Sequence, residues 1–117
     1  MSPTDKPSAL VQGTLDMLIL KTLALEPLHG YGIGARLEQI SKGTFQVNAG
    51  SLFPAFRRLE RDGLIRSEWR TTENNRRAKW YTITDAGRKR LKDQARDWAT
   101  QTSAISAILN ARLSDVS

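Results

Sequence analysis

The chain has 117 residues, of which 39% are hydrophobic and 26% are charged. This length allows one domain with a modest core, and the composition is too apolar for a disordered chain. Cysteine is absent, which excludes disulfides, thiolate metal sites and cysteine nucleophiles. No apolar run is long enough to span a bilayer, and the first ten residues lack the basic start and apolar stretch of a secretory signal. We therefore expect a cytoplasmic protein without a membrane segment.

The positive charge is concentrated in one third of the chain. The formal net charge is +6 and the pI is near 10.2. Residues 57–96 hold 13 of the 18 Lys and Arg but only 6 of the 12 Asp and Glu, a local net charge of +7. Such clustering is typical of a surface that binds a polyanion. A solvated surface of uneven charge would give the same pattern.

The first helix is expected to follow a flexible arm over residues 1–9, which are polar and contain two prolines. We expect the helix to begin at Gly13, with Thr14 as its N-cap and Asp16 in its first turn, and to end before Pro27. Its apolar residues go nearly all the way round, which is typical of a helix buried on every side. In so short a chain, this pattern predicts that a second chain covers part of the helix.

A shorter amphipathic helix is expected next, ending at Gly43, with Ile33, Leu37 and Ile40 on its buried face. Three glycines fall in the segment 30–34. They do not follow a strand, and their spacing matches no nucleotide-binding loop. We therefore interpret them as sites of close helix packing.

The segment 48–65, "NAGSLFPAFRRLERDGLI", predicts a third helix that begins near a proline. If Ser51 is the N-cap, Pro54 takes the third helical position, where its missing N–H costs no helical hydrogen bond. If Asn48 is the cap, Pro54 lies one turn deeper and is expected to kink the start of the helix. Gly63 is the expected C-terminal cap.

The two sides of this third helix differ in chemistry. The inward stripe is formed by Leu52, Phe56, Leu59 and Leu64, and the flanks and outside carry Phe53, Arg57, Arg58 and Arg61. An alternative use of the arginines is pairing within the helix, Arg58 with Asp62 and Arg57 with Glu60.

Two strands and a last helix complete the chain. "LIRSEWR" alternates, "AKWYTIT" is rich in aromatic and β-branched residues, and the turn "TTENNRR" between them tips a hairpin with amide and guanidinium groups. Thr84 is expected to cap a helix over 84–113. Its apolar residues are spaced as a heptad seam: Leu91, Ala95, Trp98, Thr102, Ile105 and Leu109. The seam favours packing against a helix of a partner chain over packing on its own domain.

Three helices followed by a hairpin is the element order of a winged helix-turn-helix. The predicted fold is therefore mainly α with a small β-hairpin, with a DNA-binding domain over 10–83 and a C-terminal dimerisation helix over 84–113. In such folds the third helix enters the major groove, and the hairpin lies beside it as a wing. Arginine suits both positions because it forks onto guanine edges and onto phosphate oxygens.

The sequence resembles the PadR-like transcriptional regulators in "GTLDMLILKTL" at 13–23, "HGYGI" at 29–33, "GSLFPAFRRLERDGLI" at 50–65 and "ENNRRAKWYTITDAGRKRL" at 73–91. These motifs cover most of residues 10–110 and are specific in combination. The single C-terminal helix is similar to that of the short subfamily, which dimerises through that helix and the first one. Phe53 stands where the family usually has Tyr. The resemblance implies a homodimeric repressor that binds a pseudo-palindromic operator in double-stranded DNA.

The resemblance also implies the residues that contact DNA and a position that could bind an effector. On the third helix the DNA-binding residues are Ala49, Ser51, Pro54, Arg57 and Arg58, and on the wing they are Asn74, Asn75, Arg76, Arg77 and Lys79. In some relatives, paired aromatic residues at the dimer centre stack flat ligands, and Trp98 falls at such a seam position. Trp98 is then either simple dimer core or the site of a small aromatic effector.

No catalytic or metal site is predicted. His29 is the only histidine and has no partner at metal-ligand spacing, so we expect it to cap or pack a helix. No nucleophile, base and orienting acid can be assembled around it, so neither an enzyme activity nor a cofactor is expected. The alternative to a DNA-binding regulator is a protein-interaction module whose basic hairpin docks on an acidic partner.

Overall fold

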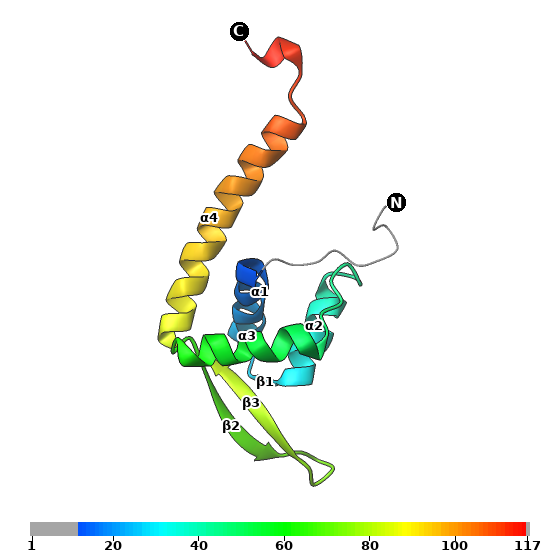
Figure 1. Ribbon diagram of the computed structural model, residues 1–117, viewed down its shortest axis with the longest axis vertical. Helices are drawn as coiled ribbons and strands as arrows, with labels where there is room; N and C mark the ends of the chain where they lie inside the picture. The colour runs from blue at the N-terminus through cyan, green and yellow to red at the C-terminus, as the bar shows by residue number, and fades with distance from the viewer. Residues whose placement is uncertain (1–11, 117) are drawn as a thin grey trace.

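The computed structural model describes residues 12–116 and packs helices on a small antiparallel sheet (Figure 1). The elements in chain order are α1 (Gln12–Leu25), β1 (Leu28–His29), α2 (Gly30–Ile40), α3 (Ala49–Arg61), β2 (Ile65–Thr71), β3 (Arg77–Ile83), α4 (Asp85–Leu109) and a 3₁₀ turn (Leu113–Asp115). The predicted winged helix-turn-helix is confirmed. The predicted arm over 1–9 lies outside the described residues. None of the described helices combines the length and the apolar character needed to cross a membrane.

The central helix of the domain is α1. The elements α2, α3, β3 and α4 all pack against it, and its largest buried side chains are Leu15, Ile19, Leu20 and Leu23. Each such side chain stabilises the fold by roughly 1.5–3 kcal/mol. Because elements of the same chain cover this helix, the prediction that its burial requires a second chain was wrong. The helix is already formed at Gln12, so Thr14 lies inside it and is not its N-cap.

The second helix, α2, approaches α3 closely because glycines face it. A Cβ added to Gly34 would lie 2.9 Å from a methyl carbon of Leu52, and one added to Gly30 would lie 3.2 Å from the ring of Phe53. At the start of α2, Nδ1 of His29 accepts a hydrogen bond from the backbone N–H three residues on, at 3.1 Å. The predicted glycine packing and the capping role of the histidine are both confirmed.

The end of α2 departs from the prediction at one residue. Gly43 closes the helix as expected, with a φ of +82° and an N–H that donates to the carbonyl of Glu38 at 2.8 Å. Ile40 is exposed and does not join Ile33 and Leu37 on the buried face. It is the last helical residue and lies one turn beyond the part of α2 that the core covers.

The N-cap of α3 is Asn48, whose Oδ1 accepts a hydrogen bond from the N–H of Ser51 at 3.0 Å. Ser51 therefore lies in the first turn, and the alternative that made it the cap was wrong. Pro54 is the sixth helical residue, so the carbonyl of Gly50 has no N–H partner within the helix. Gly63, with a φ of +74°, ends the helix as predicted.

The hairpin is confirmed as a pair of antiparallel strands, β2 and β3, with Ile65 opposite Ile83 at its base. At its tip Asn75 adopts a φ of +60°, a conformation that Asn tolerates better than most residues. The short strand β1 adds a third member through Leu28 opposite Tyr81, giving the sheet order β1-β3-β2. It was not predicted, because two residues carry no periodicity.

The last helix, α4, is joined to the end of α3 by its cap. The hydroxyl of Thr84 accepts a hydrogen bond from the N–H of Gly87 at 3.0 Å and donates one to the carbonyl of Gly63 at 2.7 Å. The helix then projects away from the domain and ends at Leu109, four residues before the predicted 113 (Figure 1). Its exposed large apolar side chains are Trp98, Ile105, Ile108 and Leu109.

Candidate nucleic-acid interface

The arginines of α3 lie on two sides of the helix. Arg57 and Arg61 are exposed and one turn apart. Arg58 is turned toward α1, where its Nη2 lies 3.0 Å from Oδ1 of Asp16, and the two side chains are only 24% and 18% exposed. Asp62, the pairing partner considered for Arg58, instead lies 3.5 Å from Arg61. Arg58, predicted as a DNA contact, is thus held in an ion pair with the central helix.

The first half of α3 presents small side chains at the surface. Ala49 and Ser51 are exposed, and Pro54 is half-buried one turn before Arg57. In helix-turn-helix proteins, the N-terminal residues of the recognition helix are those that contact base edges. These four predicted residues are therefore accessible from the side on which a groove of DNA would lie.

The hairpin tip carries the predicted cluster of amides and cations, all of them exposed: Asn74, Asn75, Arg76 and Arg77. The guanidinium of Arg77 lies 5.2 Å from the centroid of the Trp69 ring, and that of Arg70 lies 5.1 Å from Trp80 on the other face of the hairpin. Such cation–π contacts restrain the orientation of a guanidinium. Within residues 12–116 no ion pair engages Arg76, so its charge is directed to solvent.

The remaining predicted wing residue, Lys79, joins the wing to α3. Its Nζ lies 3.8 Å from Oε1 of Glu60, while Oε2 of Glu60 accepts a hydrogen bond from Ser67 at 2.7 Å. Glu60 is therefore committed to the two strands, rather than to Arg57 as the alternative pairing had it. This contact sets the distance between the recognition helix and the wing.

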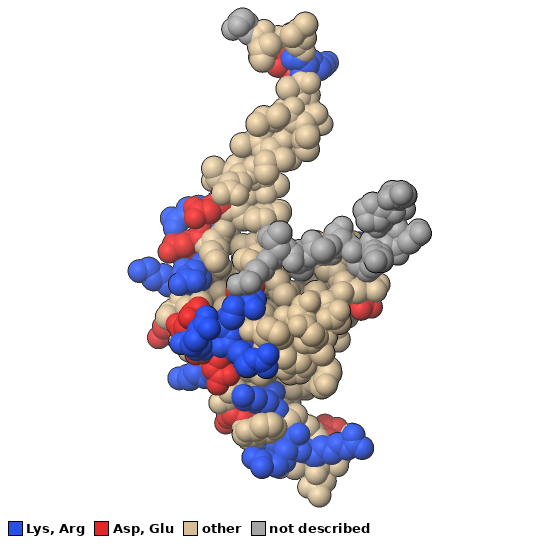
Figure 2. Space-filling view, viewed as in Figure 1, with Lys and Arg blue, Asp and Glu red and all other residues tan. Residues whose placement is uncertain are grey.

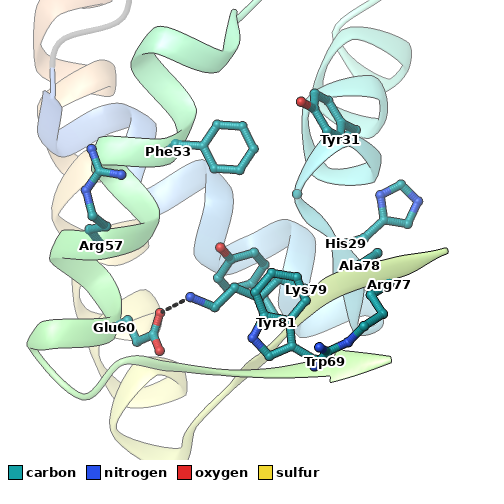
Figure 3. Close-up of a pocket in the computed structure, with 11 residues that line it drawn as sticks. His29, Tyr31, Phe53, Arg57, Glu60, Trp69, Arg77, Ala78, Lys79 and Tyr81 are labelled. Carbon is teal, nitrogen blue, oxygen red and sulfur yellow. Dashed lines mark ion pairs between the residues drawn. The ribbon is translucent and has the colours of Figure 1, made fainter. Parts of the chain in front are cut away.

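A groove of about 440 Å³ lies between α3, the start of α2 and the inner face of the wing (Figure 3). Its lining residues include Tyr31, Phe53, Arg57, Trp69, Arg77 and Tyr81. Burial raises the pKa of the Tyr81 hydroxyl above its ordinary value of 10.0, Glu60 raises it further and Arg57 opposes the shift. Tyr31 and Trp69, which are 73% and 58% exposed, were not predicted as site residues. Alternation along the strand would have shown that Trp69 shares a face with Lys79.

The basic side chains gather on the part of the molecule that contains the hairpin, α3 and the first half of α4 (Figure 2). The distal half of α4 is almost free of charge on the same view. The charge concentration found in the sequence is therefore also a concentration in space, and it can attract a polyanion over a distance of about 10 Å.

Trp98 lies apart from this interface, on α4. The ring is 49% exposed and borders a shallow groove of about 340 Å³ between α1 and α4, together with Met17 and Gln94. Its surroundings are thus the two helices through which the short PadR-like subfamily dimerises.

Catalytic and metal-binding arrangements are not found in the described part of the chain. No three His, Cys, Asp or Glu side chains among residues 12–116 come close enough to share a metal ion. His29 is occupied as the cap of α2 and packs edge-on against Trp80, with ring centroids 5.5 Å apart. The chemistry that this surface offers is binding by cations, amides and aromatic rings.

Comparison with known proteins identifies the family. The model of the transcriptional regulator PadR-like family matches residues 19–93. Transcriptional regulator Rv3488 of Mycobacterium tuberculosis is 35% identical over 78 residues, 67% of this chain and 69% of that protein. A 37.1 kDa protein in transposon TN4556 of Streptomyces fradiae is 40% identical over 89 residues, 76% of this chain but 24% of that longer protein. A solved PadR family transcriptional regulator from Eggerthella lenta superposes with a TM-score of 0.75 at 32% identity, over 86% of each chain. The matched family consists of transcriptional regulators rather than enzymes, and this chain belongs to it: it is a PadR-like transcriptional regulator.

Proposed function

We propose that this regulator is a homodimeric repressor that binds a pseudo-palindromic operator in double-stranded DNA in the cytoplasm. In each half-site α3 enters the major groove and the tip of the β2–β3 hairpin contacts phosphates or the adjacent minor groove. The observation that carries the proposal is the pair of basic surfaces on either side of one groove. Exposed Arg57 and Arg61 lie on α3, Arg76 and Arg77 lie on the wing, and the Lys79–Glu60 contact fixes their separation.

The alternative, a basic module that docks on an acidic protein, explains the wing but leaves the helix unexplained. A docking hairpin does not need a second set of arginines on a helix that begins with small side chains. The recognition geometry of a winged helix does need both.

The dimer part of the proposal rests on α4. A single chain leaves Trp98, Ile105 and Ile108 exposed along a helix that projects into solvent, and burial of apolar surface contributes roughly 25 cal/mol per Å². We expect the double variant Ile105→Lys and Ile108→Lys to sediment as a monomer. Ser106→Lys, an equally exposed site on the same helix, is the matched control and should remain dimeric. Sedimentation of the double variant as a dimer would remove α4 as the dimer contact.

Within this dimer we assign Trp98 to the contact between copies. The alternative role is a flat aromatic effector stacked between two Trp98 rings that releases the repressor from DNA. Saturating quenching of tryptophan fluorescence by planar compounds, lost in Trp98→Ala, would favour the effector role. Equal quenching in that variant would leave Trp98 as dimer core.

The proposed function is tested by a gel shift on DNA from upstream of the chain's own gene, beside a scrambled duplex of equal length, over a salt series. We expect a discrete shift on the upstream DNA that survives at salt concentrations where the scrambled duplex is released. The logarithm of the affinity should fall against that of salt with a slope of about −0.9 per phosphate neutralised. Shifts that fade together would indicate a binder without an operator. No shift on either duplex at low salt would favour the protein-docking alternative.

A further inference from the structure

We propose that the groove between α3, the start of α2 and the inner face of the wing binds a small planar aromatic anion. This aromatic groove is defined by Tyr31, Phe53, Arg57, Trp69, Arg77 and Lys79 and is distinct from the surroundings of Trp98. The binding itself is independent of the proposed function. Only its effect on DNA binding rests on that function.

The walls of the groove are aromatic from one side to the other. The rings of Tyr31 and Phe53 meet edge to face, with centroids 5.7 Å apart, and Phe53 meets Phe56 in the same way at 5.4 Å. Trp69 faces them from the wing and exposes more than half of its surface (Figure 3). Aromatic rings are attracted to other rings in offset or edge-on arrangements. A volume of about 440 Å³ lies within the range of pockets that hold small ligands.

The charge of the groove selects an anion. Three cations line it, Arg57, Arg77 and Lys79, against the single carboxylate of Glu60. Both oxygens of that carboxylate are already engaged, one by Lys79 at 3.8 Å and the other by the hydroxyl of Ser67 at 2.7 Å. The two guanidinium groups are therefore the unmatched charges. A guanidinium forks onto a carboxylate, and that of Arg77 already lies over the Trp69 ring on which the ligand would stack.

Duplex DNA alone does not account for the aromatic walls. Phosphates and sugars would reach the guanidinium groups at the rim, but they bring no flat surface to Tyr31 and Trp69. A planar ring with a carboxylate satisfies both the walls and the rim. Because it would neutralise Arg57 and Arg77, such a ligand and DNA should exclude each other.

The binding test uses the full chain labelled with ¹⁵N and follows the indole N–H signals of its three tryptophans, assigned with Trp→Phe variants. The probe is 2-naphthoate, and the uncharged match is 2-naphthamide. We expect naphthoate to move the Trp69 signal in a saturable manner without moving Trp98, and naphthamide to bind at least tenfold more weakly. Movement of Trp98 alone, no saturable movement at Trp69, or equal affinity for the amide would each overturn the proposal.

Two exposed residues test the walls and the rim separately. Tyr31→Ala should weaken the binding of both probes several-fold, because it removes a ring. Arg77→Gln should weaken naphthoate about tenfold and leave naphthamide unchanged, because it removes only a charge. Trp98→Phe is the control and should keep the affinity for naphthoate. If Tyr31→Ala and Arg77→Gln both bind naphthoate as the parent does, the ligand does not occupy this groove.

The connection to DNA is tested by repeating the gel shift with naphthoate present. Competition predicts that the apparent Kd for DNA rises in proportion to naphthoate concentration above its own Kd. DNA binding without any Trp69 response would overturn the groove proposal and leave the proposed function intact. A Trp69 response in a protein that binds no DNA would support the groove and reject the proposed function.

Discussion

Replacing Asp16 by Asn would remove the charge that holds Arg58 against α1 at 3.0 Å. Exposed ion pairs stabilise proteins by about 0.2–1 kcal/mol, and removing one member of a buried pair costs about 3–5 kcal/mol. The two side chains here are 24% and 18% exposed, and Nε of Arg58 is buried without a hydrogen-bond partner among the described residues. We therefore expect Asp16→Asn to lower the free energy of unfolding by about 2 kcal/mol, between the two limits.

The assay is urea unfolding followed by circular dichroism, with all variants at one protein concentration because the stability of a dimer depends on concentration. Asp93→Asn is the matched control. It removes the same charge from an exposed pair with Arg96, whose side chains are 66% and 50% exposed, and it should cost less than about 0.5 kcal/mol. In a double-mutant cycle with Arg58→Met, the coupling energy isolates the pair. If Asp16→Asn costs no more than Asp93→Asn, the contact between α3 and α1 does not stabilise the fold.

The remaining predictions concern the DNA contacts and one helix junction. Arg57→Ala should relax the preference at one base pair by about 1–3 kcal/mol, measured by competition with single-base operator variants, and an unchanged preference would make Arg57 a backbone contact. Arg76→Ala should weaken binding to all sequences and flatten the salt slope by about one unit per half-site; an unchanged slope would remove it from the phosphate contacts. Gly87→Ala should cost about 3 kcal/mol or more in urea unfolding, because its Cβ would collide with the carbonyl oxygen of Leu64. Gly13→Ala, whose Cβ meets nothing within 4 Å, should instead gain about 0.5–1 kcal/mol, and equal losses in the two variants would contradict the collision.

The parts of the fold that the sequence predicts are those governed by local periodicity and by caps. The stripe Leu52, Phe56 and Leu59 repeats every three or four residues and is buried as expected. Gly63 and Thr84 end and begin helices because their own backbone and side chain supply what a helix terminus lacks. These features depend on neighbours within a few residues, which the sequence displays directly.

The start of α3 shows where local information stops. Asn48 and Ser51 are both good N-caps, and each is followed by residues that can form a helix. The choice depends on where the chain leaves the extended conformation. That residue is Asn48, with φ −85° and ψ 169°. The loop after α2 and the burial of Leu52 against Gly34 fix this point, and both are tertiary effects.

The candidate site is less predictable because its contacts join residues far apart in the sequence. Arg58 and Asp16 are 42 residues apart, and the pair forms only because α1 packs under α3. The aromatic groove likewise needs α2, α3 and the wing in place before Tyr31 faces Trp69. Residue types and exposure could be inferred from the sequence, whereas the partner of each charge could not.

The two adjacent arginines of α3 take different roles for a geometric reason. Successive residues of an α-helix are separated by about 100°, so Arg57 and Arg58 cannot face the same surface. Once Asp16 holds Arg58 toward α1, the residue that shares the outer face with Arg57 is Arg61, one turn on and exposed. The outer face of the recognition helix is therefore built from Pro54, Arg57 and Arg61, which border one surface hollow. It follows that substitution of Arg58 should be read out first as a loss of stability and substitution of Arg61 as a loss of DNA affinity.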